Sequence, residues 1–200
     1  MQNDLPYTSS VKDMPFMFSE MKRTAMLLCD GLSGDDIIRQ SLDKNIYQLE
    51  KEKRRRDVPL RMIKRLGTIG QPLIEIIATG RDEEARLVAF LAFIKADRLL
   101  FEYMREVYTD IFNAGHIEIH DKDFLDFIER KAQNNDVVEK WSTDTLTNIR
   151  GKIKSSLCDA GLAKRIKVGL LIQKPIVTKE FLQMICDNEK DYAKVMLMEV

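Results

Sequence analysis

The sequence has few of the residues that cross-link a chain or interrupt a helix. Cys29, Cys158 and Cys186 are odd in number and far apart, so neither a disulfide framework nor a zinc site is expected. Only 5 prolines and 9 glycines occur in 200 residues. This composition favours a mainly α protein in a reduced, cytoplasmic compartment.

Long apolar runs are also missing. The longest run, Leu87–Ala96, is interrupted by Lys95 and falls far short of the roughly 20 residues that span a bilayer. The N-terminal stretch is polar and contains Pro6 and Pro15, which is unlike a signal peptide. We therefore expect no association with a membrane.

Signatures of catalysis are absent as well. There is no glycine-rich phosphate loop, no nucleophile elbow, and no metalloprotease or nuclease motif. His116, Glu118 and His120 alternate and would share one face of a strand, but no cysteine or further histidine can complete a metal site. We expect a non-enzymatic protein with no metal and no cofactor.

The formal net charge of zero conceals a segregation of charge along the chain. Residues 51–80 carry 8 basic and 3 acidic side chains, and residues 137–180 carry 9 and 4. Residues 81–136, between these blocks, carry 8 basic and 13 acidic side chains. Two separate anion-binding surfaces on a neutral protein are the prediction.

The first basic block coincides with a predicted helix that begins near the arginine triplet, with Pro59 in its first turn. Positive charges at the N-terminal end of a helix are unfavourable unless an anion lies nearby, so this block predicts phosphate contacts. The alternative is a solvated basic helix paired with acids such as Asp57. The predicted contacts are Lys53, Arg54, Arg55, Arg56, Arg61, Lys64 and Arg65.

Local signals predict further helices on either side of this block. Gly31 ends a first helix, and Ser33, followed by two aspartates, opens a second. An amphipathic stretch over residues 81–113, divided near Asp97, links an N-terminal helical module (1–80) to a C-terminal module (81–200). The first fifteen residues are predicted to be a loose arm.

The second basic block predicts a short helix, then a helix capped by Ser142 and ended by Gly161, then a β-hairpin. The capped helix has one apolar stripe, and its opposite face has small polar residues. Thr147, Asn148 and Lys152 would approach base edges in a major groove. A solvated helix face would have the same composition.

The predicted hairpin has a turn or a bulge at Gly169, and the HIEIH segment at residues 116–120 is expected to pair with it, as the first strand of a winged helix does. Lys164, Arg165 and Lys167 would then contact the phosphate backbone. Lysines that guard the edge of an ordinary hairpin are the alternative. The predicted fold is therefore two helix-turn-helix-like modules, the second a winged helix.

Several segments together resemble the BrxA family of bacteriophage exclusion systems. They are FMFSEMKRTAMLLCDGLS, NIYQ at residues 45–48, ADRLLFEYMREVY at residues 96–108, EKWSTDTLTNIR and DAGL. The resemblance covers nearly the whole chain. It implies a helical protein that binds duplex DNA beside a methyltransferase, a large ATPase and a phosphatase-like protein. The family has no catalytic motif to transfer.

From these patterns we predict a non-catalytic component of a phage-defence system that binds double-stranded DNA. Two alternatives remain at this point. The protein is an adaptor that recruits defence proteins through its acidic middle or through Met184, Met196 and Met198. Or it is a transcriptional regulator within the same system.

Overall fold

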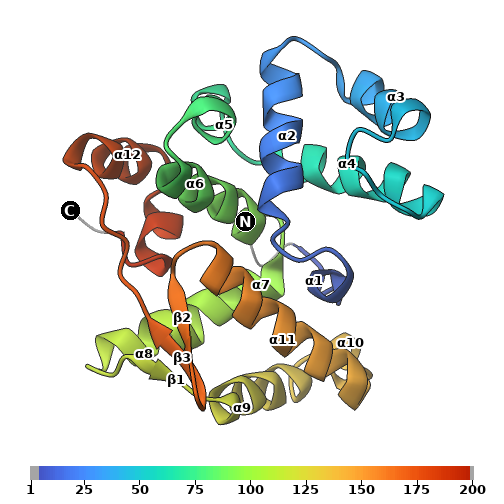
Figure 1. The fold of residues 1–200 in the computed structure, drawn as a ribbon. Coiled ribbons are helices and arrows are strands. Elements are labelled where there is room, and N and C mark those ends of the chain that lie inside the picture. Colours follow the sequence, from blue (N-terminus) through green and yellow to red (C-terminus); the bar gives the residue numbers. More distant parts are fainter. Residues whose placement is uncertain (1–4, 199–200) are drawn as a thin grey trace. The chain divides into compact units, whose positions relative to one another are not determined.

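The chain forms two compact units in the computed structural model, which describes residues 5–198 (Figure 1). The N-terminal unit contains residues 17–96, and the C-terminal unit contains residues 5–16 and 97–198. The division between the units therefore falls after residue 96, whereas the expected boundary followed residue 80. The helix that follows this position packs against the two helices at residues 18–29 and 71–79, and so belongs to the first unit.

The N-terminal unit is a bundle of five helices with no strand among its described residues. They are α2 (Phe18–Cys29), α3 (Gly34–Lys44), α4 (Glu52–Leu66), α5 (Gln71–Thr79) and α6 (Asp82–Lys95). Helix α6 is the centre of the unit, because every side chain from Leu87 to Ile94 is buried. A helix that is apolar all round must be covered on all sides, and α2, α4 and α5 provide this cover.

The predicted ends of α2 and α3 are confirmed. Gly31 follows α2 with a φ of +85°, in the left-handed region that glycine adopts without strain. Ser33 caps α3 in a reciprocal capping box, in which its Oγ accepts from the Asp36 backbone and the Asp36 carboxylate accepts from the Ser33 backbone.

Helix α4 begins at Glu52, so Pro59 lies inside it and the expected place in the first turn is wrong. A proline in a helix interior has no N–H for the carbonyl four residues earlier, here that of Arg55. The hydroxyl of Ser41, a fully buried residue of α3, donates to this carbonyl at 2.6 Å. A side chain from the neighbouring helix thus replaces the hydrogen bond that Pro59 removes.

The C-terminal unit consists of helices around a small antiparallel sheet. Its helices are α1 (Ser10–Asp13), α7 (Arg98–Tyr103), the π-helical segment η2 (Met104–Thr109), α8 (Asp110–Asn113), α9 (Asp121–Ala132), α10 (Asp136–Glu139), α11 (Thr143–Asp159) and α12 (Lys179–Val195). Its strands are β1 (Glu118–Ile119), β2 (Ala163–Ile166) and β3 (Gly169–Ile172). The predicted division near Asp97 is confirmed, because Asp97 caps α7 by accepting from the Leu100 N–H at 3.0 Å.

The sheet has the order β1-β3-β2, with both pairs antiparallel. Ile119 of β1 lies opposite Leu170 of β3, and Arg165 of β2 lies opposite the same residue on its other side. The expected pairing of the HIEIH segment with the hairpin is confirmed. The fold is thus mainly helical with one three-stranded sheet, and no helix in the described part of the chain is both long and apolar enough to cross a bilayer.

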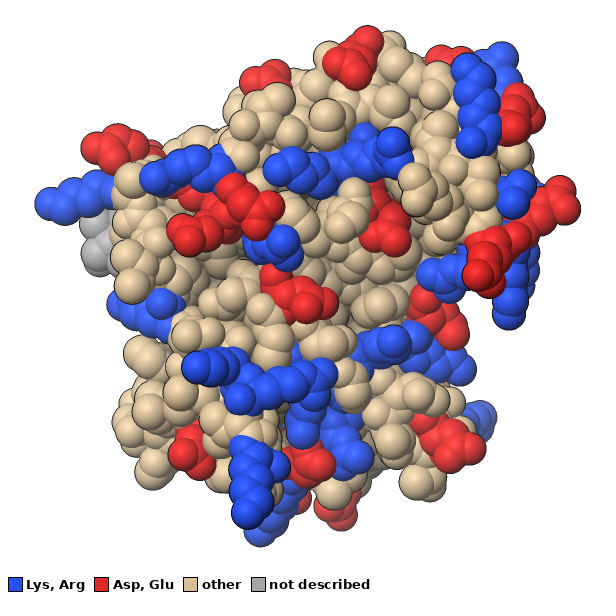
Figure 2. All heavy atoms as spheres, in the orientation of Figure 1, with Lys and Arg blue, Asp and Glu red and all other residues tan. Residues whose placement is uncertain are grey.

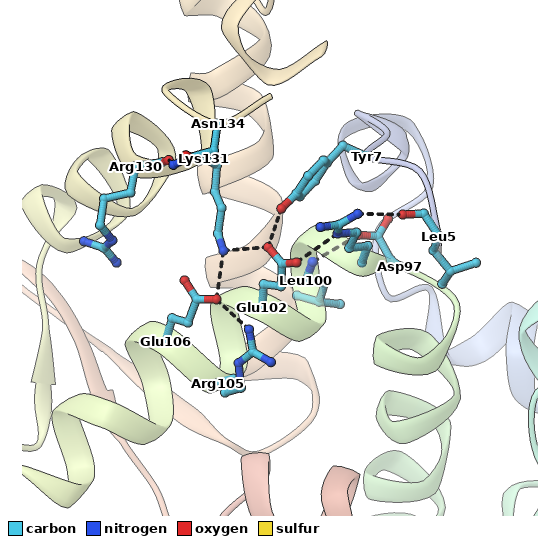
Figure 3. Close-up of polar contacts among 11 residues, drawn as sticks. Leu5, Tyr7, Asp97, Leu100, Glu102, Arg105, Glu106, Arg130, Lys131 and Asn134 are labelled. Atoms are coloured by element: carbon cyan, nitrogen blue, oxygen red, sulfur yellow. Dashed lines mark hydrogen bonds and ion pairs between the residues drawn. The ribbon is translucent and has the colours of Figure 1, made fainter. Parts of the chain in front are cut away.

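The N-terminal arm is fixed to the C-terminal unit by a buried ionic network, contrary to the expected loose arm (Figure 3). Glu102 of α7 is 3% exposed and accepts from three donors. They are the Tyr7 hydroxyl of the arm at 2.6 Å, Arg98 Nε at 2.9 Å and Lys131 Nζ of α9 at 2.7 Å. Burial raises the pKa of Glu102, but these donors outweigh it and the pKa is lowered.

The pairing of Ser41 with the Arg55 carbonyl can be tested by a double-mutant cycle. Ser41→Ala leaves the partly buried Arg55 carbonyl without a donor and should lower the free energy of unfolding by about 1–3 kcal/mol. In a Pro59→Ala background the helix supplies its own N–H, so Ser41→Ala should cost much less. Urea unfolding of the four proteins measures both costs, and equal costs would show that Ser41 does not compensate for the proline.

The Glu102 network predicts a stability that depends on pH. Because the carboxyl pKa is lowered in the fold, its contribution is present above the unfolded value of about 4.3 and is lost as the pH falls below it. Glu102→Gln should cost about 3 kcal/mol at pH 7 and clearly less at pH 3.5. Urea midpoints at both pH values measure this. Glu129→Gln, on the exposed face of α9, is the control with little effect; a cost for Glu102→Gln that does not change with pH would contradict the prediction.

Candidate nucleic-acid interface

Helix α11 is the first element of the candidate interface, and its predicted cap, stripe and end are confirmed. Ser142 Oγ accepts from the Thr145 N–H at 3.2 Å. Ile149, Ile153 and Leu157 are buried on one side of the helix. At the other end, Gly161 has a φ of +77°. The apolar side fixes the orientation of α11, so its opposite side must face solvent.

The solvent face of α11 has short side chains around a glycine. Thr147, Asn148, Gly151 and Lys152 are all exposed, as is Asp144 in the first turn. Glycine in the interior of a helix costs about 1 kcal/mol relative to alanine. A face of this kind allows another surface to come close to the helix backbone.

Two further cations of α11, which the sequence did not single out, are held by an acid of α9. Arg150 Nη1 lies 3.4 Å from the Asp121 carboxylate, and Lys154 Nζ donates to the same group. The hydrogen bond from Lys154 lowers the pKa of Asp121. These two side chains lie on α11 beside its solvent face, but their charge is used within the unit, where it fixes α11 to the start of α9.

The β2–β3 hairpin is the second element of the candidate interface. Lys164, Arg165 and Lys167 are exposed, and none of them forms an ion pair within residues 5–198. Lys152 of α11 has no ion pair there either. Figure 2 shows Lys and Arg side chains gathered in the lower part of the view, over the elements that Figure 1 identifies as α11 and the hairpin. This unpaired positive charge is suited to an anionic partner.

Buried contacts fix the position of the hairpin at its base. The hydroxyl of Tyr108, in the π-helical segment, donates to the Leu162 carbonyl at 2.7 Å and lies 3.2 Å from the Gln173 carbonyl. These carbonyls lie just before β2 and just after β3. One phenol therefore holds both ends of the hairpin, and no local signal in the sequence could have shown this.

The turn of the hairpin is held by His120, which follows β1. His120 Nδ1 lies 2.9 Å from the Val168 carbonyl in the turn, and its Nε2 lies 3.6 Å from the Glu118 carboxylate. His120 thus links the end of β1 to the turn of the hairpin. In the described part of the chain, no cluster of His, Cys, Asp or Glu could hold a metal ion.

Gly169 sets how closely the hairpin approaches β1. Its φ is +130°, and a Cβ at this position would lie 2.2 Å from the Ile119 carbonyl oxygen. Only glycine allows this approach, because any other residue would clash with the backbone of the neighbouring strand. The sequence marked Gly169 as a turn or bulge, but the reason for the glycine is a contact with a distant strand.

The N-terminal unit has a separate basic surface along α4. Lys53, Arg56 and Lys64 are exposed at helical spacing on one side, with the half-exposed Leu60 between them. None of the three cations forms an ion pair with a described residue. They form a basic stripe that remains available to an anion.

The other predicted contacts of α4 are less accessible. Arg54, Arg55 and Arg61 are partly buried, and Arg55 Nε donates to the Leu49 carbonyl at 2.9 Å. This hydrogen bond fixes the turn that precedes α4.

Arg65, which was expected to contact DNA, is not at the surface. Its side chain is 1% exposed, and its guanidinium lies 4.0 Å from the centre of the Phe93 ring of α6. A guanidinium over an aromatic face is stabilised by the ring quadrupole. Arg65 therefore belongs to the packing between α4 and α6.

The fold and this surface define a mainly helical protein with unpaired cations on a helix and an adjoining hairpin. The family model described as BrxA matches residues 5–189. A curated relative from Bacillus cereus (strain H3081.97), "BREX protein BrxA", is 29% identical over 179 residues, or 90% of each chain. The chain belongs to the BrxA family and is a component of a BREX phage-defence system. The expected family resemblance is confirmed.

A similar fold occurs in a solved structure, a crystal structure of an uncharacterized protein from Magnetospirillum magneticum. The two chains superpose with a TM-score of 0.79 and 20% sequence identity, covering 96% of this chain and 99% of that one. At this identity the similarity concerns the fold alone.

Substitution of Gly169 tests how the hairpin is positioned. Gly169→Ala should lower the free energy of unfolding by more than about 2 kcal/mol, because the methyl group meets the Ile119 carbonyl. Amide exchange at Ile172, whose N–H donates to the Ile117 carbonyl at 2.7 Å, should accelerate. Gly161→Ala, with a positive φ but open space around it, should cost less. Equal losses of stability in Gly169→Ala and Gly161→Ala would show that the close approach to β1 is not what requires a glycine at position 169.

Proposed function

We propose that this protein binds duplex DNA without catalysing a reaction on it, as the DNA-binding component of its BREX system. The proposal rests on which cations of the C-terminal unit have a carboxylate partner and which do not. Arg150 and Lys154 are paired with Asp121, whereas Lys152 and the three cations of the hairpin are exposed and unpaired among the described residues. Exposed cations without counterions are what a polyanion requires.

The order of the elements supports this proposal. A helical segment, β1, α9, the short α10, α11, β2 and β3 follow one another, and the sheet order is β1-β3-β2. Apart from α10, this order is like that of a winged helix, in which the helix before the hairpin enters the major groove and the hairpin contacts the backbone. In this arrangement Thr147 and Asn148 approach base edges, and Lys164, Arg165 and Lys167 contact phosphates.

The basic stripe of α4 is proposed as a second phosphate contact. Lys53, Arg56 and Lys64 project from one side of a helix and offer charge without a base-reading pattern, because all three are long cations. Contacts of this type add affinity that does not depend on sequence. Together the two surfaces predict a protein that binds DNA with little sequence preference.

The adaptor alternative has less support in the structure. Of the three methionines considered as a docking surface, Met196 is fully buried and Met198 is 3% exposed. Met196 and Met198 are part of the core of the C-terminal unit and cannot receive a partner, whereas Met184 of α12 is half-buried. Contacts with other BREX proteins, such as the methyltransferase, the ATPase and the phosphatase-like protein, remain part of the proposal, with no surface assigned.

The DNA-binding proposal predicts a steep dependence on salt. If roughly six phosphates are contacted, log affinity for a 30-bp duplex should fall with log salt at a slope of about −5. The triple variant Lys164→Glu, Arg165→Glu, Lys167→Glu should bind more weakly, with a slope reduced by about 3, because three phosphate contacts are removed. Fluorescence anisotropy over a salt series measures both quantities.

A control with the same change in charge separates local contacts from overall charge. Lys179→Glu, Lys190→Glu, Lys194→Glu places the reversals on exposed positions of α12, and its DNA affinity should remain closer to that of the wild type. Lys53→Glu, Arg56→Glu, Lys64→Glu tests the α4 stripe in the same assay. The proposal would be refuted if the wild-type protein did not raise the anisotropy of the duplex, or if its affinity did not depend on salt. Equal losses of DNA affinity in the hairpin and α12 variants would also refute it.

A further inference from the structure

Gly151 lies at the middle of α11, where a glycine is unfavourable for the helix itself. It lacks the common structural reasons for a glycine at such a position. Its φ is not positive, so the backbone does not require a glycine. A Cβ built on Gly151 would meet no described atom within 4 Å, so no neighbouring helix or side chain needs the space. Nothing within residues 5–198 therefore gains from the missing side chain.

The residues around Gly151 indicate which kind of partner surface would fit against a helix without a side chain at this position. At 100° per residue, Asp144 and Gly151 lie within about 20° of each other and form a line along α11, opposite the buried Ile149 and Ile153. Thr147 lies about 40° to one side of Gly151, and Asn148 about 60° to the other. The centre of the exposed face is thus the part of α11 that projects least from the helix axis. A convex surface, or the floor of a groove, can approach the backbone there.

The charges on and beside this line indicate which part of α11 would contact base edges and which part would contact phosphates. Asp144 is exposed on the same line, and a carboxylate is repelled by phosphate but can accept from the amino group of cytosine. Lys152 lies at the side of the line, about 100° around the helix, where a groove wall with its phosphates would be. The central line is suited to bases, and the flank is suited to the backbone.

We propose that Gly151 is the point of closest approach of α11 to the floor of the DNA major groove, so that the absence of a side chain sets how deeply the helix enters. This inference rests on the proposed DNA binding and adds a residue that determines the fit. Thr147 and Asn148 have short side chains, which reach base edges only if the helix is deep in the groove. A methyl group at Gly151 would move the helix outward by on the order of 1 Å and lengthen their hydrogen bonds beyond the favourable range.

The inference predicts that stability and binding change in opposite directions. Gly151→Ala should raise the thermal midpoint by about 2–4 °C, because alanine favours the helix and has open space. It should weaken binding to a 30-bp DNA duplex at least about 5-fold, the lower limit expected when a base contact is lost. Gly151→Gln, with a longer side chain, should weaken DNA binding further while the protein remains folded.

Two controls isolate the groove contact. Gly34→Ala introduces a methyl group in α3, which contributes none of the proposed DNA contacts. The methyl lies at an ordinary distance of 3.5 Å from the apolar Ile63 side chain and should leave DNA affinity unchanged. An RNA duplex of the same sequence has a major groove too narrow for a helix, so its binding reports phosphate contacts alone. Gly151→Ala should leave RNA-duplex affinity unchanged.

The outcomes separate this inference from the function on which it rests. If the wild type and both Gly151 variants bind DNA equally while the hairpin triple variant binds weakly, DNA binding stands and the role of Gly151 is refuted. If the wild type shows no salt-dependent DNA binding, the proposed function fails and this inference fails with it. A Gly151→Ala protein with a lower thermal midpoint would show that the glycine serves the fold, which also refutes the inference.

Discussion

The buried carboxylate of Glu102 is the constraint on which the C-terminal unit depends. A charge without solvent is unfavourable unless donors surround it, and its three donors come from the arm, from α7 and from α9. Satisfying one carboxylate therefore brings together three segments that are distant in sequence (Figure 3). Helix α9 is positioned in this way, and Asp121 at its start in turn holds α11 through Arg150 and Lys154. A chain of ionic contacts that begins in the interior thus adds to the apolar packing that orients α11.

The cations of the C-terminal unit serve two purposes, and the structure separates them. Lys131, Arg98, Arg150 and Lys154 have carboxylate partners and hold the unit together. Lys152 of α11 and the three cations of the hairpin have no such partner in the described chain. Their mutual repulsion slightly opposes folding. The formal charge of zero is therefore a sum over paired and unpaired groups, and says little about what the surface attracts.

Local signals predicted those parts of the fold that depend on neighbours in the sequence. Ser33, Ser142 and Gly161 mark helix ends because a cap is formed by residues within one turn. Three features were not predicted because their causes are distant: Pro59 stays in a helix through Ser41, Arg65 is buried through Phe93, and the arm is held by Glu102. For the candidate interface, the sequence identified the exposed cations and the hairpin. It could not distinguish free from paired charges, as Lys152 and Lys154 on the same helix illustrate.

The discontinuity of the C-terminal unit has a consequence for how the chain is made. Its first segment, residues 5–16, leaves the ribosome before the N-terminal unit, yet its partners Glu102 and Ser156 follow only after about 80 intervening residues or more. The N-terminal unit can fold as soon as residue 96 emerges, while the arm waits without a partner. Helix α11 and the hairpin become fixed only when translation is nearly finished. A chain released prematurely would therefore carry a folded first unit but not an ordered helix-and-hairpin surface.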